Sequence, residues 1–288
     1  MAVSMADISG LGLSGVTKAG AEDLERLGLL TEIGQRIEPD EVAALGSLVA
    51  SGHAPFGIEG MRLNIAAVDD AFREMSIRMV TDYVESAAAV PSLRKVNIHA
   101  APRRWHREAQ TSGREGSYDR LIDALRRIGA AARRHGIEIV VENNRAYWEG
   151  VAESTLLEEV DRDAQDVYFC TAPEEWIRAC EDVAMKNVRL CLDTSHACTY
   201  AHTFPEGEER SAAMDAFLAR PELVSHVHWN GNFIDDNRGR DDSHLSVGKG
   251  TLGSEFHRKI KSHGATKLLE HWHGLDALEE ELEYILGL

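Results

Sequence analysis

Short apolar segments alternate with longer helical segments along the whole chain, and this alternation restricts the fold more than any other feature. Eight of the apolar segments have the length and composition of buried strands. Between them, apolar residues recur at spacings of three and four, as on one face of a helix. No stretch rich in proline, serine or charge interrupts the pattern, so we expect residues 1–288 to form one domain.

Eight strands and eight helices in 288 residues predict an α/β fold, a single-domain (β/α)8 TIM barrel. An open, doubly wound sheet is the alternative, but SGLGLSG is a poor match to the glycine-rich phosphate loop that such a sheet normally carries. The predicted strands are Asp7–Gly10, Leu29–Gly34, Leu48–His53, Lys95–Ala100, Ile137–Asn143, Val188–Thr194, Val224–Asn230 and Lys267–Glu270. The predicted helices include Ala66–Ala87, Ser117–His135, Ala172–Ala184, Ser254–Ser262 and Leu275–Leu286.

Charge and cysteine content restrict the partners and the compartment. The net charge of −17 disfavours anionic membranes and, averaged over the surface, nucleic acid. The cysteines are too few and too irregularly spaced for a disulfide framework or a cysteine-based zinc site, which predicts a reducing, cytoplasmic location. Neither a signal peptide nor an apolar stretch of about 18 residues is found, so we expect no secretion and no membrane contact. The four cysteines are Cys170, Cys180, Cys191 and Cys198.

Histidine, aspartate or glutamate ends six of the eight predicted strands, where a barrel places its active site. Any one of them alone is more often a hydrogen-bonded structural residue or a helix N-cap. Together, four carboxylates and five imidazoles would crowd one cleft, which costs several kcal/mol unless cations neutralise them. The sequence therefore predicts divalent-metal ligands. They are His53, His99, Glu142, Asp193, His196, His228, Asp242, His244 and Glu270.

The mixture of imidazole and carboxylate ligands suits Zn²⁺, Mn²⁺ or Fe²⁺. Nine ligands are too many for one ion, so we expect two or three ions, zinc first among them, with Glu142 or another carboxylate bridging. Such a centre lowers the pKa of a bridging water and holds the attacking and leaving oxygens of a phosphoryl transfer.

Seven segments of the chain resemble the endonuclease IV branch of the xylose-isomerase-like TIM barrels, AP endonuclease family 2. They are HAPF (53–56), NIHAAP (97–102), VVENN (140–144), CLDTSHA (191–197), VHWNGN (227–232), DDSHLSVGKGTLG (241–253) and LLEHW (268–272). The resemblance implies that the nine residues hold three zinc ions and that the protein hydrolyses a phosphodiester or phosphate ester, such as damaged DNA. Glu142, Glu270 and His196 are then the expected catalytic residues.

Sugar isomerases and epimerases of the same superfamily provide the alternative. In them one metal holds a sugar carbonyl and hydroxyl while two glutamates, here Glu142 and Glu270, shuttle a proton. The substrate is then a small sugar or sugar phosphate, and the oligomeric state stays open. Asp242 and His244 favour the hydrolase, because a one-metal isomerase has little use for them. Glu32 looks more like the isomerases, and Gly231 replaces the aspartate of the endonuclease branch.

Basic and aromatic residues in loops on the same face are candidate substrate contacts. Arginine binds phosphate oxygens in pairs, and an aromatic ring stacks on a base or sugar, although solvated or packed loops are the alternative. The predicted substrate-binding residues are Phe56, Arg103, Arg104, Trp105, Asn230 and Lys249, and Arg107, Arg114, Arg238 and Arg240 complete the basic clusters. His226 lies two residues before His228, so we expect it one layer deeper on the same side of its strand, in a supporting or core role.

Overall fold

Eight parallel strands close into a barrel in the computed structural model, which describes residues 8–106 and 110–288. Each strand pairs with its neighbour in chain order, and the last pairs with the first. The predicted (β/α)8 TIM barrel is therefore confirmed. The barrel strands are β1 (Leu13–Val16), β2 (Leu30–Ile33), β3 (Val49–His53), β6 (Lys95–His99), β8 (Glu138–Glu142), β10 (Val188–Asp193), β11 (Val224–His228) and β12 (Thr266–Leu268).

Seven of the predicted strands lie within two residues of their observed bounds, and the first is wrong. Within Asp7–Gly10, Ile8 and Ser9 are helical, and Asp7 lies outside the described residues. The strand begins at Leu13, after Gly12 turns the chain with a φ of 61°. Leucines alternate with small residues on both sides of this turn, so alternation alone could not place the strand.

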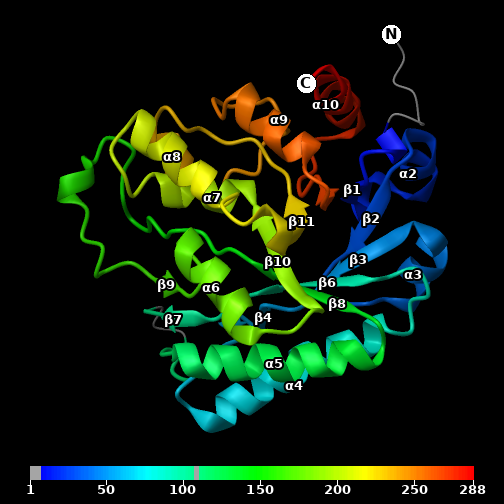
Figure 1. Cartoon of the computed structure of the whole chain (residues 1–288), viewed down its shortest axis with the longest axis horizontal. Coiled ribbons are helices and arrows are strands. Elements are labelled where there is room, and N and C mark those ends of the chain that lie inside the picture. The colour runs from blue at the N-terminus through cyan, green and yellow to red at the C-terminus, as the bar shows by residue number, and fades with distance from the viewer. Residues whose placement is uncertain (1–7, 107–109) are drawn as a thin grey trace.

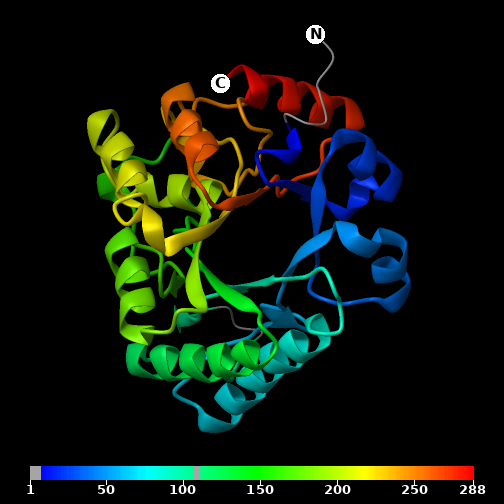
Figure 2. The same cartoon turned by 45° about the vertical axis from the view of Figure 1, so that its right-hand side comes forward.

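Helices surround the strands on the outside of the barrel (Figure 2). The five predicted helices are present, although α4 begins at Asp70 and not at Ala66, because the Asp69 side chain accepts a hydrogen bond from Phe72 N at 3.1 Å and caps the helix there. The α-helices are α2 (Ala21–Leu27), α3 (Pro39–Leu45), α4 (Asp70–Ala87), α5 (Tyr118–Arg134), α6 (Pro173–Val183), α7 (Thr194–Ala201), α8 (Glu208–Ala216), α9 (Ser254–Ser262) and α10 (Leu275–Gly287).

Short elements shape the loops at the carboxyl ends of the strands. Two small antiparallel sheets pair β4 (Gly57–Ile58) with β5 (Met61–Arg62) and β7 (Pro102–Arg104) with β9 (Val167–Tyr168). Both lie on segments that follow a barrel strand directly (Figure 1). The 3-10 helices are η1 (Thr17–Ala19), η2 (Gly46–Leu48), η3 (Leu157–Glu159), η4 (Pro221–Leu223) and η5 (Asn237–Arg240).

Two lysines fill the opposite, amino-terminal end of the barrel. Lys267 Nζ donates to the carbonyls of His263 and Ala265, each at 2.8 Å. Lys95 Nζ donates to Ser225 O at 2.5 Å and to Thr266 Oγ1 at 2.9 Å. The predicted ligands lie away from these lysines, at the carboxyl ends of the strands and in the segments that follow them. Among the described residues, no helix combines the length and apolar character needed to span a bilayer.

Candidate metal centre

All nine predicted ligands come together in three overlapping groups, six from the ends of strands and three, His196, Asp242 and His244, from helix α7 and the loop after β11. In each group the potential ligand atoms lie within 4.8 Å of one another. The His53 group is His53, His99 and Glu142; the central group is Glu142, Asp193, His228 and Glu270; the Asp242 group is Asp193, His196, Asp242 and His244. Glu142 and Asp193 each belong to two groups, so the groups form one continuous cluster.

The two imidazoles of the His53 group face one oxygen of Glu142. Nε2 of His53 lies 3.6 Å from Oε2 of Glu142, and Nε2 of His99 lies 3.3 Å from the same atom. Nδ1 of His53 is hydrogen-bonded to Ala54 O at 2.9 Å, and because a carbonyl only accepts, this nitrogen carries the proton. Nε2 of His53 is then an unprotonated ligand atom, the arrangement usual for metal-binding histidines.

The central group surrounds Nδ1 of His228, whose side chain is fully buried. Oε2 of Glu270 lies 2.9 Å from this nitrogen, Oε1 of Glu142 lies 3.7 Å away and Oδ2 of Asp193 lies 3.8 Å away. Asp193 also caps helix α7, because its Oδ1 accepts a hydrogen bond from His196 N at 2.7 Å. Asp193 can therefore cap the helix with Oδ1 and still offer Oδ2 to a metal ion.

The Asp242 group joins helix α7 to the loop after β11. Nε2 of His196 lies 3.2 Å from Oδ2 of Asp242, and Nε2 of His244 lies 3.0 Å from Oδ1. Nδ1 of each histidine is hydrogen-bonded to a backbone carbonyl, of Asn143 at 2.8 Å and of Glu270 at 3.0 Å, which again leaves Nε2 as the ligand atom. The backbone of His244 has a φ of 41°, a strained conformation that residues at functional sites often hold.

Several buried polar atoms of this cluster make no hydrogen bond with any described residue. They are Nδ1 of His228 and Oε2 of Glu270, which lie 2.9 Å apart, and Oδ1 of Asp242, which lies 3.0 Å from Nε2 of His244. These contacts are ion pairs without hydrogen-bond geometry, so the atoms keep lone pairs for a bound cation. Since the donors are imidazole nitrogens and carboxylate oxygens, the cluster fits divalent transition metals or zinc.

Charges within the cluster balance one another. Burial opposes ionisation of Glu142, but neighbouring imidazoles, His99 first, outweigh it and hold the pKa of Glu142 well below its usual range. Burial opposes protonation of His53, yet the Glu142 carboxylate outweighs it and raises the pKa of His53 to about 9. At His244 burial is likewise outweighed, by Asp193 first, and the pKa rises to about 10. In the metal-free protein His53 and His244 therefore carry a second ring proton, on Nε2, which a divalent cation would displace to leave Nε2 as the ligand atom. Burial instead lowers the pKa of His99 to about 4, so this ring stays neutral.

A cavity of about 320 Å³ opens beside the central group. Glu270 and His53 reach it from the cluster, and Lys18 and Gln35 line it from the first two strand-to-helix loops. Glu270 is the more accessible of the two glutamates in the central group, since its side chain is 25% exposed and that of Glu142 only 1%. The cavity has the volume of a small-molecule site.

Most of the predicted substrate contacts are engaged elsewhere. Arg103 pairs with Glu175, Arg104 donates to Asp163 O at 2.8 Å, and Lys249 lies 3.6 Å from Glu280. Trp105 is buried at 3% exposure and packs edge-on against Tyr147 and Tyr168.

The other basic loop residues also have partners within the protein. Arg238 pairs with Asp236, and Arg240 donates to Thr155 O. Arg114 donates to Gln110 O, and Arg107 lies outside the described residues. For all of these a substrate role stays a prediction.

Phe56 and Asn230 do lie at the cluster. The Phe56 ring is 4.8 Å from the His99 ring, centre to centre. Asn230 Nδ2 donates to Oδ2 of Asp193 at 3.3 Å, so Asn230 orients a potential ligand. A Cβ atom at the next residue, Gly231, would lie 2.5 Å from Lys249 O and 2.6 Å from Ser246 O. The loop after β11 therefore leaves no room for the aspartate that the endonuclease branch has at this position.

Three side chains at the cluster were missed from the sequence. Asn97 donates to Oε2 of Glu142 and lies two residues before His99, the spacing that puts both on one side of a strand. Cys191 stands in the same relation to Asp193. Arg145 follows β8, and its Nη1 lies 3.6 Å from Oδ2 of Asp242. The period of two along each strand could have found the first two.

The sequence profile of the xylose isomerase-like TIM barrel family matches residues 23–287. An uncharacterized protein of Methanocaldococcus jannaschii is 25% identical over 215 residues, which cover 74% of this chain and 60% of the relative. The chain thus spans less than two thirds of the length of this relative.

Solved structures share the fold over almost the whole chain. A D-tagatose 3-epimerase-like protein has a TM-score of 0.64 at 20% identity and covers 95% of this chain and 97% of its own. A Thermus thermophilus protein, from a crystal soaked with zinc chloride, scores 0.61 at 18% identity, with 96% and 98% covered. The 3-keto-D-glucoside 4-epimerase of E. coli scores 0.62 at 15% identity, with 96% and 99% covered. At these identities the similarity shows the fold alone.

Proposed function

Because the chain belongs to the xylose isomerase-like TIM barrel family, we propose that it is a divalent-metal-dependent isomerase or epimerase of a small sugar or sugar phosphate. The observation that carries this proposal is the cavity of about 320 Å³ at the exposed face of Glu270. A space of this size suits a small polar molecule, and the side chains around it offer carboxylate, amide, ammonium and imidazole groups to hydroxyls.

Two further observations favour a small substrate over DNA. Of the basic side chains in the loops around the cluster, Arg103, Arg238 and Lys249 face carboxylates, so they offer little free positive charge to a phosphate backbone. Two of the similar structures are described as an epimerase of a sugar derivative and a sugar-epimerase-like protein. The comparisons therefore support the isomerase alternative better than the endonuclease-like hydrolase.

The central group supplies the chemistry that an epimerase needs. Glu142 and Glu270 approach Nδ1 of His228 from different strands, so both carboxylates border one position. A divalent cation held there would polarise a substrate carbonyl and make the adjacent C–H more acidic. Glu270 faces the cavity, so we assign it removal of that proton, which it would then release to solvent. Glu142 is ionised in the metal-free protein, so it would first take a proton from solvent. It would deliver that proton to the same carbon from the other side, which inverts it, or to the neighbouring carbon, which moves the carbonyl.

Exchange with heavy water tests this function. The metal-loaded protein is incubated in D₂O with ketoses, aldoses and their phosphates, and the recovered sugars are analysed by NMR. We expect one solvent deuteron at a single carbon of one class of sugar. Glu270→Gln should reduce the rate by at least about 100-fold, whereas Glu279→Gln, on the outer helix α10 and paired with Arg26, should not. Absence of exchange with every sugar class would contradict the proposal.

A second function, metal-dependent hydrolysis of a phosphate ester, is favoured by one specific observation. Oε2 of Glu142 faces Nε2 of His53 and Nε2 of His99, while Oε1 faces Nδ1 of His228 at 3.7 Å. A carboxylate with one oxygen directed to each of two ligand groups is typical of a bridge between two ions, and paired ions about 3.5–4 Å apart serve hydrolysis.

Metal counting and a DNA substrate separate the two functions. A hydrolase should bind two or three ions and nick an oligonucleotide that carries an abasic site, and Asp242→Asn should abolish the nicking. The isomerase should exchange deuterium and leave that oligonucleotide intact. Nicking of the oligonucleotide without deuterium exchange into any sugar would favour the hydrolase over the isomerase.

A further inference from the structure

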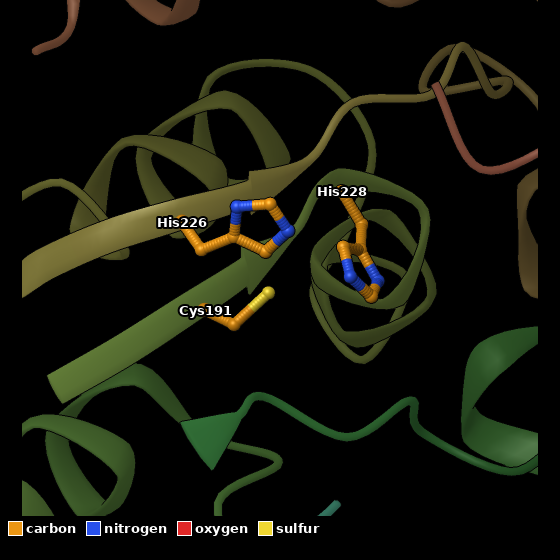
Figure 3. Close-up of side chains that lie close together, drawn as sticks. All are labelled: Cys191, His226 and His228. Atoms are coloured by element: carbon orange, nitrogen blue, oxygen red, sulfur yellow. The ribbon is translucent and has the colours of Figure 1, made fainter. Parts of the chain in front are cut away.

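A second cluster of potential ligands lies inside the barrel, one layer below the central group. The inner group consists of Cys191, His226 and His228, whose potential ligand atoms lie within 4.8 Å of one another. Cys191 on β10 and His226 on β11 are partners in the strand register, and Figure 3 shows the thiol and the two rings close together between these strands. None of the three side chains is more than 1% exposed, so the group is closed to bulk water.

Glu32, on β2, reaches the same space from another strand of the barrel. Its Oε2 lies 3.4 Å from Nε2 of His226, and its Oε1 lies 3.6 Å from Nε2 of His228. Glu32 is itself 7% exposed. The interior therefore holds one sulfur, two imidazoles and one carboxylate around a common space.

The polar atoms that face this space lack partners. Nε2 of His226, Nε2 of His228 and Oε2 of Glu32 make no hydrogen bond with any described residue. The orientation of His226 is nevertheless fixed, because its Nδ1 is hydrogen-bonded to Thr266 Oγ1 at 2.8 Å and that hydroxyl accepts from Lys95 Nζ at 2.9 Å. Nε2 of His226 is thus held toward Glu32 with nothing between them, which indicates a missing ligand.

The donor set and its spacing fit zinc. In a tetrahedral site with Zn–N and Zn–O bonds of about 2.1 Å, neighbouring ligand atoms lie about 3.4 Å apart. The His226–Glu32 and His228–Glu32 separations are 3.4 and 3.6 Å, each to a different oxygen of the carboxylate. The group whose ligand atoms all lie within 4.8 Å of one another is Cys191, His226 and His228, so the Glu32 side chain would shift toward Cys191 Sγ to complete the tetrahedron. Thiolate sulfur selects zinc over magnesium or manganese. One thiolate and one carboxylate also neutralise a divalent ion, so the filled site carries no net charge into the barrel interior.

We propose that Cys191, His226, His228 and Glu32 form a buried zinc site separate from the three ligand groups at the strand ends. Binding releases to solvent the thiol proton and any proton on the Nε2 atoms of His226 and His228. When ions fill both the inner site and the central group, His228 also gives up its Nδ1 proton and bridges them as an imidazolate. His228 belongs to both the central group and the inner group, since its Nδ1 faces Glu270 and its Nε2 faces Glu32. An ion in the inner site therefore fixes the ring that also borders the central group. This inference is independent of which reaction the strand-end groups catalyse.

Cobalt substitution tests the inner site, because sulfur ligation gives cobalt a near-ultraviolet charge-transfer band that nitrogen and oxygen ligands do not. Among the nine predicted ligands there is no cysteine, so a band that Cys191→Ser removes and Cys180→Ser keeps reports Cys191. We expect the band in the cobalt-loaded full-length protein. Cys191→Ser should abolish the band and lower the bound metal by one equivalent. Cys180→Ser is the matched control, because Cys180 is buried in α6 with its Sγ donating to Val188 O, away from the ligand groups.

X-ray absorption on the unsubstituted zinc protein provides a test that needs no variant. It should show a sulfur neighbour at about 2.3 Å from zinc. His226→Gln, checked for folding by circular dichroism, should lose the same equivalent of metal as Cys191→Ser. Cobalt binding without a sulfur band, zinc without a sulfur neighbour, or unchanged metal content in Cys191→Ser would each overturn the proposal and leave only water in this space.

Discussion

The strand ends and the loops that follow them differ in how they hold their polar side chains. At the strand ends, residues from six strands converge, and every potential ligand predicted there lies in one of three contiguous groups. In the loops, Asp242 and His244 do reach a ligand group, but Arg103 and Lys249 pair with carboxylates on neighbouring helices, and Trp105 is buried among tyrosines. The barrel sets the direction of a side chain at a strand end, whereas the path of a loop decides what its side chains meet.

The largest effect is expected from a substitution of Glu142, the strand-end residue shared by two ligand groups. Glu142→Gln removes a charged oxygen from both the His53 group and the central group, so we expect less bound metal and a turnover reduced by at least about 1,000-fold. Glu138→Gln, at the other end of the same strand, is the control and should keep both properties. Metal analysis and steady-state kinetics measure the result, and a variant that retains the full metal content would break the comparison.

Trp105 tests the loop side. Because its ring is buried against Tyr147 and Tyr168, Trp105→Ala should cost about 3–5 kcal/mol of unfolding free energy and leave the turnover of the remaining folded protein nearly unchanged. Denaturant titration and kinetics on the same sample measure the two effects. Intact stability with a lost substrate affinity would show instead that Trp105 contacts the substrate.

The metal-free protein should lose stability as the pH rises. His53 and His244 have pKa values of about 9 and about 10, above the ordinary value of 6.5, so protonation favours the folded state. This contribution is complete below pH 6.5 and disappears as the pH rises through 9–10, and for His53 it amounts to about 3 kcal/mol. Melting temperatures of chelator-treated protein at about pH 6.5 and about pH 10 test the prediction. Metal-loaded protein should change less, and equal losses in both forms would contradict it.

The smallest effects are expected at the charged loop residues. Lys249→Ala removes an exposed ion pair with Glu280, worth less than about 1 kcal/mol. Arg103→Ala removes a partly buried pair with Glu175, so we expect a somewhat larger loss of stability. Turnover should stay within about twofold of the unsubstituted protein. A tenfold increase in KM for either variant would show that this side chain contacts the substrate. The expectation that these loop residues have no role in substrate binding would then be wrong.

What the sequence could predict follows the same division. The alternation of apolar runs located seven strands and therefore the position of every strand-end residue, including Glu142 and Glu270. It misplaced the first strand, where glycines interrupt the pattern. It gave no information on the contacts of Trp105 or Arg103, because their partners are residues distant in sequence. The spacing of the cysteines gave no indication of a role for Cys191. Its neighbour His226 lies 35 residues away in the sequence, on the adjacent strand.

The pairing of β1 with β12 has a consequence for biosynthesis. Leu13 is paired with Lys267, so the barrel cannot close while the ribosome is still making the last strand. Glu270 follows that strand directly, and without it the central group is incomplete. A nascent chain therefore exposes the unpaired edges of β1 and β11 until β12 has left the ribosome, and such edges invite aggregation. Assembly of the central group, and with it any metal loading there, follows the synthesis of β12 and Glu270.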